Sequence, residues 1–203
     1  MFTGITSDIG RVRTVHRTNR DLRLEIESAL DFSDAAIGAS ILNNGCCLTV
    51  VGIGQGSFEV EATNETLACS TVGDWMAGTQ INLERPQRLN GELGGHIVSG
   101  HVDAVGEVSA LVPDGGAHRL RVRVPAPLHR FIAKKGAIAV DGVSLTVTES
   151  EGDEFEVCLI PHTWDTTTLK DLVPGSRVNI EIDILARYMA RWLETSKDDA
   201  HLR

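Results

Sequence analysis

The chain contains an internal duplication. When the sequence is shifted against itself by 97 residues, 43–84 lie over 140–181 without a gap, and thirteen of these 42 positions are identical. Average composition would give roughly two or three identities. The densest block places Gly45-Cys46-Cys47-Leu48-Thr49-Val50 over Gly142-Val143-Ser144-Leu145-Thr146-Val147. A repeat of this length predicts two copies of one structural unit, so the fold must be one that can be built twice.

The duplication reaches the beginning of each half. Phe2-Thr3-Gly4 resembles Val98-Ser99-Gly100 at a shift of 96 residues. The segment 85–95 is rich in turn-forming residues and is the natural linker between the copies. We therefore expect an N-terminal domain over 1–90, a second domain over 91–183, and a separate C-terminal helix and tail over 184–203.

Each half has the alternation typical of β-strands. Residues 22–26 and 120–124 alternate apolar and polar side chains, which is the pattern of a half-buried strand. Residues 52–56 and 151–153 are typical of hairpin connections. Strand-like segments recur about every ten residues, which indicates small antiparallel barrels or sandwiches. These patterns predict an all-β fold.

The C-terminal tail differs from the rest of the chain. Its apolar residues are spaced as on one face of an amphipathic helix: Leu185, Tyr188, Met189, Trp192 and Leu193. One interpretation is that this helix packs on its own barrel. The other is that it pairs with copies of itself, since two closed barrels leave little for it to cover and exposed apolar stripes mark interfaces.

The charge and cysteine content exclude several classes of protein. The 203 residues carry a net charge of −9, whereas binding to nucleic acid or to an anionic membrane needs a basic surface. No apolar run is long enough to span a membrane, and the first residues lack the basic and apolar regions of a signal peptide. The four cysteines form no Cys-x-x-Cys pair, so we expect neither a zinc site nor a disulfide framework. These features predict a cytoplasmic protein without a bound metal.

The positions at which the two copies differ are the best candidates for chemistry. Cys47 in the first half corresponds to Ser144 in the second. Residues two apart on a strand share a face, so Cys47 projects with Thr49, and Ser144 projects with Thr146. An unpaired cysteine is more often a small buried hydrophobe, and polar strand residues more often face solvent. Their recurrence at equivalent positions nevertheless favours a pair of polar pockets.

The histidines and the missing motifs narrow the chemistry further. His96 and His101 are five residues apart, so on one strand they would lie on opposite faces and could not bind one metal ion. His101 alone could act as a general base. The sequence has no dinucleotide-binding glycine fingerprint, no phosphate-binding loop and no Gly-x-Ser-x-Gly elbow. The residues therefore indicate a duplicated β protein with paired pockets for small molecules.

Six motifs, in order along the chain, resemble the riboflavin synthase α-chain family. They are Met-Phe-Thr-Gly-Ile (1–5), Asn-Gly-Cys-Cys-Leu-Thr-Val (44–50), Gly-Gly-His-x-x-Ser-Gly-His (94–101), Asp-Gly-Val-Ser-Leu-Thr-Val (141–147), Ile-Pro-His-Thr (160–163) with Thr-Thr-Leu (167–169), and Asn-Ile-Glu-Ile-Asp (179–183). The resemblance runs from Met1 to about Leu193, which is nearly the whole chain.

The resemblance implies a fold and a reaction. The fold would be two six-stranded antiparallel Greek-key β-barrels, each holding one lumazine, with a C-terminal α-helix that drives homotrimer formation. The reaction would be the dismutation of two molecules of 6,7-dimethyl-8-ribityllumazine into riboflavin and 5-amino-6-(D-ribitylamino)uracil, without a redox cofactor or metal. The working site would join the first barrel of one subunit to the second barrel of its neighbour. Lumazine synthase is a candidate partner.

The resemblance also implies which residues form the site. The first pocket would contain 4–6, 47–49 and 61–66, and the second would contain 100–102, 144–146 and 158–163. Thr6 stands where relatives often carry valine. The expected substrate-binding residues are Phe2, Gly4, Ile5, Thr6, Cys47, Leu48, Thr49, Glu61, Ala62, Thr63, Asn64, Glu65, Thr66, Gly100, His101, Val102, Lys135, Ser144, Leu145, Thr146, Cys158, Leu159, Ile160, Pro161, His162 and Thr163.

Six residues receive catalytic roles on this basis: Cys47, Ser40, Ser144, Thr146, His101 and Asp141. Cys47 and Ser40 would act on the lumazine of the first barrel, Cys47 as a nucleophile or as a hydrogen-bond partner of an activated water. Ser144, Thr146 and His101 would polarise and deprotonate the lumazine of the second barrel. Asp141 would position the loop before Ser144. His101 and Ser144 are both candidates for moving the proton.

Two other classes of protein fit the same duplicated fold. One is a non-catalytic lumazine or flavin carrier, such as the antenna proteins of luminous bacteria, and the other is a structural protein that uses only the barrels and the helix. Shared folds host different functions, so the site must decide between them. Stoichiometry separates the three classes, with two lumazines per chain expected for the enzyme, one for an antenna and none for a scaffold.

Overall fold

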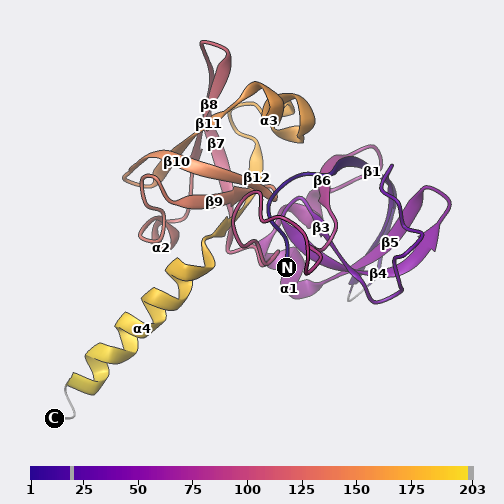
Figure 1. Ribbon diagram of the computed structural model, residues 1–203, viewed down its shortest axis with the longest axis horizontal. Helices are drawn as coiled ribbons and strands as arrows, with labels where there is room; N and C mark the ends of the chain where they lie inside the picture. The colour runs from indigo at the N-terminus through magenta and orange to yellow at the C-terminus, as the bar shows by residue number, and fades with distance from the viewer. Residues whose placement is uncertain (19–20, 201–203) are drawn as a thin grey trace.

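A computed structural model describes residues 1–18 and 21–200, with side chains described as far as residue 196. Each half of the chain closes into an antiparallel barrel of six strands, and the two barrels lie side by side (Figure 1). The first barrel has the strand order β1-β2-β5-β4-β3-β6. Its strands are β1 (Asp8–Arg17), β2 (Asp21–Glu27), β3 (Ser40–Asn43), β4 (Cys46–Gly54), β5 (Ser57–Thr63) and β6 (Gln80–Glu84).

The second barrel repeats this order as β7-β8-β11-β10-β9-β12. Its strands are β7 (Ala104–Asp114), β8 (Ala117–Arg123), β9 (Ala137–Val140), β10 (Val143–Glu151), β11 (Glu154–Leu159) and β12 (Arg177–Ile182). The predicted strands at 22–26 and 120–124 lie largely or wholly within β2 and β8, and the predicted hairpins at 52–56 and 151–153 join β4 to β5 and β10 to β11. The all-β prediction is confirmed.

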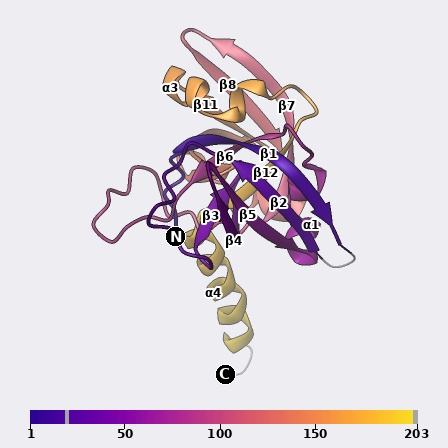
Figure 2. The ribbon, with the colours of Figure 1, turned by 90° about the vertical axis from the view of Figure 1, so that its right-hand side faces the viewer.

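Short helices connect strands within each barrel, and one longer helix follows the second barrel. The short elements are α1 (Asn64–Cys69), η1 (Thr71–Asp74), α2 (Ala126–His129), α3 (Pro161–Thr166) and η2 (Thr168–Asp171). The helix α4 (Ile184–Ala200) projects away from both barrels, below them in Figure 2. Among residues 1–18 and 21–200, no helix combines the length and apolar character that crossing a bilayer would need.

Each barrel has its own core, built by strand alternation. On β2, Leu22, Leu24 and Ile26 are fully buried, while the residues between them are not. Burying one such side chain contributes roughly 1.5–3 kcal/mol to folding. A third, smaller cluster lies between the barrels and includes Phe2 and Val98. The cores therefore follow from the period-two pattern, and the inter-barrel cluster brings the equivalent beginnings of the two halves together.

The barrels are joined by hydrogen bonds that occur in equivalent pairs. The Thr71 backbone amide donates to Oδ1 of Asn179 at 2.7 Å, and the equivalent Thr168 amide donates to Oδ1 of Asn82 at 2.8 Å. Each asparagine belongs to the opposite barrel from its donor. The interface therefore has an approximate two-fold relation between the halves, and removing either asparagine would leave a buried amide unpaired, a loss of about 1–3 kcal/mol.

The same asparagines hold the turns before β4 and β10. Nδ2 of Asn82 donates to the carbonyl oxygen of Asp141 at 3.0 Å, and Nδ2 of Asn179 donates to that of Asn44 at 2.8 Å. Asn44 and Asp141 both have positive φ, at 42° and 45°. Asparagine and aspartate tolerate this left-handed conformation better than other side chains. The two turns therefore share one backbone conformation. The first carries the side-chain amide of Asn44, and the second carries the carboxyl group of Asp141.

Candidate active site

The beginning of each half lies on the opposite barrel. The Ser144 amide of β10 donates to the Gly4 carbonyl at 2.8 Å, and the Cys47 amide of β4 donates to the Gly100 carbonyl at 2.9 Å. Phe2 and Val98 pair with each other where the two segments meet. The expected grouping of segments into pockets is therefore wrong within one chain. Residues 4–6 accompany 144–146, and residues 100–102 accompany 47–49.

We call residues 4–6 and 100–102 the exchanged segments, because each lies on the barrel of the opposite half. Glycine makes this exchange possible. Gly4 and Gly100 have φ values of +76° and +80°, which are strained for other residues. A Cβ atom on Gly4 would lie 2.6 Å from Cβ of Ser144, and one on Gly100 would lie 2.5 Å from Cβ of Cys47. Both distances are shorter than atoms can approach without displacement. The two segments can therefore cover the two strands only with glycine at these positions.

A buried carboxylate holds the segment that covers Ser144. Glu84, at the end of β6, accepts hydrogen bonds from the amide and hydroxyl of Thr3 at 2.7 and 2.8 Å and from the Gly4 amide at 2.9 Å. Burial raises the pKa of Glu84, while these donors act in the opposite direction. The Glu84 carboxylate thus supplies hydrogen-bond acceptors to a segment that lies against the other barrel.

Glu181, at the equivalent place on β12, holds the other segment. It accepts from the amide and hydroxyl of Ser99 at 2.7 and 2.6 Å, from the Gly100 amide at 2.9 Å and from the His101 amide at 3.1 Å. The motif Asn-Ile-Glu-Ile-Asp therefore contains two positioning groups, Asn179 for the turns and Glu181 for the segment over Cys47.

The segment 100–102 and the first barrel enclose a pocket of about 260 Å³. Its lining residues are Cys46, Cys47, Glu65, Thr66, Cys69, Ser70, Gly100, His101 and Val102. Burial raises the pKa of the Cys46 thiol to about 12, so it stays protonated and inert. Cys47 is only half-buried, whereas Leu48 faces the core and Thr49 is exposed. The predicted alternation at this strand is confirmed, and Cys47 is the more accessible of the adjacent thiols.

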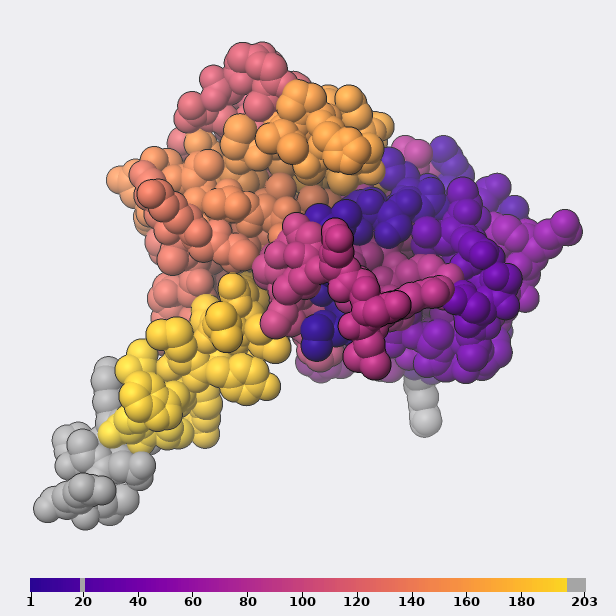
Figure 3. Space-filling model, viewed as in Figure 1, coloured from indigo at the N-terminus to yellow at the C-terminus, as the bar shows by residue number. Residues whose placement is uncertain are grey.

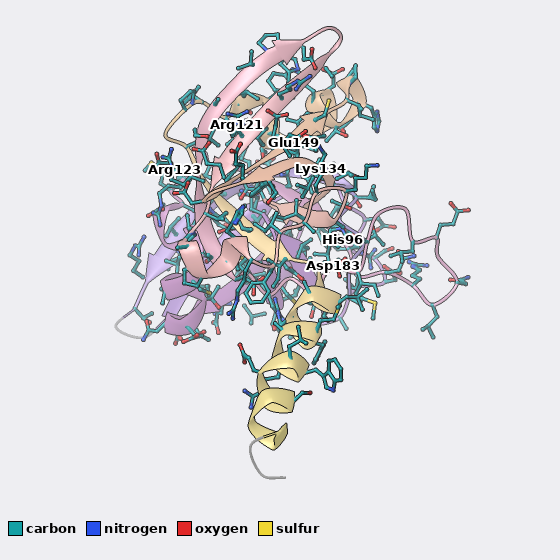
Figure 4. All side chains as sticks on the ribbon, turned by 90° about the vertical axis from the view of Figure 1, so that its left-hand side faces the viewer. His96, Arg121, Arg123, Lys134, Glu149 and Asp183 are labelled. Atoms are coloured by element: carbon teal, nitrogen blue, oxygen red, sulfur yellow. The ribbon has the colours of Figure 1, made fainter. Side chains whose placement is uncertain are left out.

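Ser144 has a partner that the sequence did not identify. Nδ1 of His96 lies 2.7 Å from Oγ of Ser144, and Nε2 of His96 is buried with no hydrogen-bond partner among the described residues. Burial lowers the pKa of His96, and Asp183 opposes this shift. Figure 4 shows His96 and Asp183 near each other at the start of α4. A histidine kept neutral beside a hydroxyl can accept its proton.

His96 reaches Ser144 because Gly95 precedes it. A Cβ atom on Gly95 would lie 2.2 Å from the Thr3 carbonyl and 2.8 Å from Oγ of Ser144. The His96 amide also donates to the Thr3 carbonyl at 3.2 Å. The sequence signal for His96 was the run Gly94-Gly95-His96, which permits close approach of the backbone, although its spacing from His101 indicated only that the two are not metal ligands.

His101 lies at the other pocket. It lines the cavity beside Cys47, and its amide is bound by Glu181. The hypothesis that His101 acts with Ser144 and Thr146 on one ligand is therefore wrong within a single chain, because the exchange of segments carries residue 101 to the first barrel. Ser144 instead has His96 beside it.

The other expected site residues fall into three groups. Ser40 pairs with Thr49 across β3 and β4, and Thr49 pairs with Glu61 across β4 and β5, so these three lie side by side. The side chains that face the cores or the inter-barrel cluster are Phe2, Leu48, Ala62, Leu145 and Leu159. The exposed or half-buried residues are Ile5, Thr6, Thr63, Asn64, Glu65, Thr66, Val102, Lys135, Thr146, Cys158, Ile160, Pro161, His162 and Thr163.

Asp141 is buried at the barrel interface. Its Oδ1 accepts from the Asn179 backbone amide at 2.7 Å. In the first half, Oδ1 of Asn44 accepts in the same way from the Asn82 backbone amide at 2.6 Å. Burial raises the pKa of Asp141 to about 7, and the hydrogen bond from Asn179 opposes this shift. These contacts hold the turn before β10. Within the described residues, no group of three histidine, cysteine or acidic side chains is arranged to bind a metal ion.

The two barrels present equivalent strand positions, one with a thiol beside a pocket and the other with a hydroxyl hydrogen-bonded to a histidine, as expected of a duplicated small-molecule-binding protein. Residues 3–86 and 99–183 each match the lumazine binding domain family. Over 202 residues the chain is 46% identical to riboflavin synthase from Brucella abortus, covering 97% of this chain and all of that one. It is 40% identical to riboflavin synthase from Photobacterium phosphoreum, covering 98% and 92% of the two chains.

A solved structure has the same fold. The crystal structure of LumP complexed with riboflavin superposes with a TM-score of 0.82 at 24% identity, covering 90% of this chain and 99% of that one. The chain belongs to the riboflavin synthase family of lumazine-binding proteins, and the resemblance noted in its sequence is confirmed.

Proposed function

We propose that this chain is a riboflavin synthase. Two molecules of 6,7-dimethyl-8-ribityllumazine react, a four-carbon unit passes from one to the other, and the products are riboflavin and 5-amino-6-(D-ribitylamino)uracil. The observation that carries this proposal is the equivalent backbone setting of Cys47 and Ser144, which have unlike side chains. Equivalent settings suit two copies of one substrate, and unlike groups can give the two copies different roles.

The largest contribution to the rate is expected from holding two rings together. Effective molarities of well-oriented reactants correspond to roughly 7–11 kcal/mol of the barrier. Backbone groups of the exchanged segments and the short side chains of Thr49 and Thr146 suit the polar edges of the lumazine ring and its ribityl hydroxyls. The acidic C7 methyl group of lumazine then needs only a modest base.

Ser144 and His96 are the base that the geometry favours. The neutral His96 imidazole accepts a proton through Oγ of Ser144, and the lumazine in the second barrel loses its C7 methyl proton to this pair. Cys47 lies at the first-barrel lumazine, as a nucleophile or as a partner of an activated water. His101 and Ser40 line or flank the first pocket, and Asp141 holds the turn that presents Ser144.

A trimer through α4 completes the proposed site. The apolar stripe of α4 is largely open to solvent in the single chain, with Leu185, Tyr188, Met189, Trp192 and Leu193 between 51% and 69% exposed. Figure 3 shows the helix extending outward from the second barrel. The barrel thus covers little of the stripe, although Met189 and Leu193 face Phe131 across a groove. The large exposed remainder favours the interpretation that the helix pairs with copies of itself. Association through α4 brings the first barrel of one subunit to the second barrel of its neighbour.

The decisive experiment follows both pteridine species at once. The purified chain is mixed with 6,7-dimethyl-8-ribityllumazine in the presence of a chelator, and lumazine and riboflavin are followed by absorbance. We expect one riboflavin for every two lumazines consumed. Binding without turnover would instead support a lumazine or flavin carrier, a second candidate favoured by the fold similarity to LumP.

The role of α4 has its own test. Removing residues 185–203 should give monomers by light scattering and should abolish turnover, since the two halves of the proposed site would then remain on separate molecules. The matched control is Thr195→Ala, which changes an exposed polar residue whose hydroxyl bonds only within the same helix. An unchanged mass after truncation would contradict the assignment of α4 to assembly.

A further inference from the structure

An arginine of α4 is bound to the segment that covers Cys47. Nη2 of Arg187 donates to both carboxylate oxygens of Asp103, at 2.8 and 2.9 Å, and lies 3.4 Å from the carbonyl oxygen of His101. The helix begins at Ile184, so Arg187 is in its first turn. One side chain thus connects the start of α4 to two residues of the pocket segment.

Asp103 is also fixed from the barrel side. Its Oδ2 accepts from the Ile182 amide at 2.9 Å, and its own amide donates to the Ile180 carbonyl at 2.8 Å. Directly before it, His101 and Val102 line the pocket beside Cys47. The carboxylate therefore lies between β12 and α4, and its position sets where the preceding two residues enter the pocket wall.

The ion pair is more constrained than others on this helix. The Arg187 side chain is 34% exposed and that of Asp103 is 18% exposed. Further along α4, Arg191 pairs with Glu194 of its own helix at 3.6 Å, and those side chains are 74% and 51% exposed. Exposed pairs within one helix contribute little, whereas a charged hydrogen bond to a half-buried carboxylate restricts both partners. Arg191 is thus a natural control for Arg187.

Among the described residues, the pair has no counterpart at Ser144. Ser7 is the residue of the first half that corresponds to Asp103, and the residue that corresponds to Arg187 is Asn90 in the linker. Like the Asp103 amide, the Ser7 amide donates to the neighbouring strand, to the Leu83 carbonyl at 2.8 Å. The segment over Ser144 is held by Glu84, without a cation from a helix. The segment over Ser144 can therefore serve as a reference within the same molecule, since it is held without an arginine from a helix.

We propose that Arg187 is a positioning residue, which holds His101 and Val102 over the Cys47 thiol through its contacts with Asp103 and the His101 carbonyl and so makes the first-barrel pocket depend on the placement of α4. This inference rests on the proposed function only in treating the Cys47 pocket as a substrate pocket. Its first test needs no turnover.

The first test measures the reactivity of Cys47. The full chain and the variants Arg187→Met, Asp103→Asn and Arg191→Met are alkylated with iodoacetamide, and labelling of each cysteine is followed by peptide mass spectrometry. We expect the rate at Cys47 to rise about two- to fivefold in the first two variants, because the segment above it opens more often. The exposed Cys158 of the second barrel should keep its rate in every variant.

Three comparisons keep this test specific. Cys46 is buried beside Cys47, so labelling of Cys46 in a variant would indicate general unfolding and would overturn the proposal. Arg191→Met should match the unmodified chain. A double variant that exchanges the charges, Arg187→Asp with Asp103→Arg, should recover part of the protection, and failure of both single variants to alter Cys47 would also overturn it.

The second test uses turnover and separates the two proposals. In Arg187→Met, KM for lumazine should rise about two- to fivefold with a smaller change in kcat, while the mass by light scattering stays that of the unmodified chain. The KM of Arg187→Lys should fall between those of the unmodified chain and Arg187→Met, since lysine keeps the charge and loses the planar donor group. An unmodified chain that makes no riboflavin would contradict the proposed function and leave the labelling result standing, whereas normal turnover with unchanged labelling would contradict only the role of Arg187.

Discussion

At Cys47 and at Ser144 the chain builds the same backbone arrangement twice. Each residue donates its amide to a glycine carbonyl of the exchanged segment, and a glutamate on the last strand of the barrel that contributes this segment holds it. The side chains then differ. Cys47 has His101 in its pocket wall, whereas Ser144 is hydrogen-bonded to His96. The comparison teaches that the two copies share one backbone arrangement, and that a few side chains make the two positions chemically different.

The largest expected effect comes from removing His96, the group that makes the Ser144 position chemically different from the Cys47 position. His96→Gln keeps a polar side chain and removes the base, so kcat should fall about 10²- to 10⁴-fold, the range for loss of a general base. Binding of riboflavin to the first pocket should be unchanged. A loss of less than tenfold would mean that Ser144 does not use His96.

The same residue predicts the acidic side of the pH profile. Burial lowers the pKa of His96, so the imidazole stays neutral to below its ordinary value near 6.5 and activity should decline only under that pH. The profile of kcat against pH measures this limb. In His96→Gln the limb should disappear, and its persistence would assign it to another group.

The next effect tests the shared backbone. Gly4→Ala and Gly100→Ala each force a Cβ atom against the opposite barrel at a positive φ, so each should lower the free energy of unfolding by roughly 2–4 kcal/mol in urea titrations. The matched control is Gly78→Ala, at a positive φ with no atom within 4 Å of the added Cβ, where only the backbone strain remains. Equal losses at all three positions would contradict the importance of the close approach.

A smaller effect is expected when the turn of the second half is given the side chain found in the first half. Asp141→Asn reproduces the amide of Asn44 and keeps an oxygen to accept from the Asn179 amide. The folded pKa of Asp141 is about 7, above its unfolded value of 3.8, so the stability it contributes is fully present below pH 4 and is lost as pH rises toward 7. The variant should therefore gain stability relative to the unmodified chain as pH rises from 4 to 8, because its amide has no charged form to bury.

The measurement is thermal unfolding of both proteins at pH 5 and pH 8. Turnover of Asp141→Asn should stay near that of the unmodified chain, because the turn before Ser144 keeps its bonds. A large loss of turnover with normal stability would instead assign Asp141 a direct part in the chemistry.

The smallest effect concerns a difference between the exchanged segments. Thr6 corresponds to Val102, and its Oγ1 is buried with no hydrogen-bond partner among the described residues. Thr6→Val should raise the free energy of unfolding by about 0.5–1 kcal/mol, since an unpaired buried hydroxyl is removed at similar volume. Val102→Thr is the reciprocal variant and should lose a similar amount. A loss of stability in Thr6→Val would show that the hydroxyl has a partner.

Much of this molecule follows from its sequence, for identifiable reasons. The strand alternation at 22–26, the repeat and the helical spacing from Leu185 to Leu193 are local patterns, and each predicted its element. The exchange of segments is not local. Gly4 could cover either barrel with the same backbone chemistry, because Cys47 and Ser144 stand at equivalent places. His96 was missed for the same reason, since only the exchange brings it to Ser144, 48 residues further along the chain.

The exchanged segments also set the order in which the molecule becomes competent during synthesis. The strand that carries Cys47 is made early, yet its cover at Gly100 emerges only after the linker, and the cover for Ser144 at Gly4 is made first and must wait for the last third of the chain. Contacts between residues this far apart form late, after the entropy of closing long loops has been overcome. We therefore expect a ribosome-bound first barrel to have its core but an incomplete pocket wall, and ligand binding to begin only late in folding.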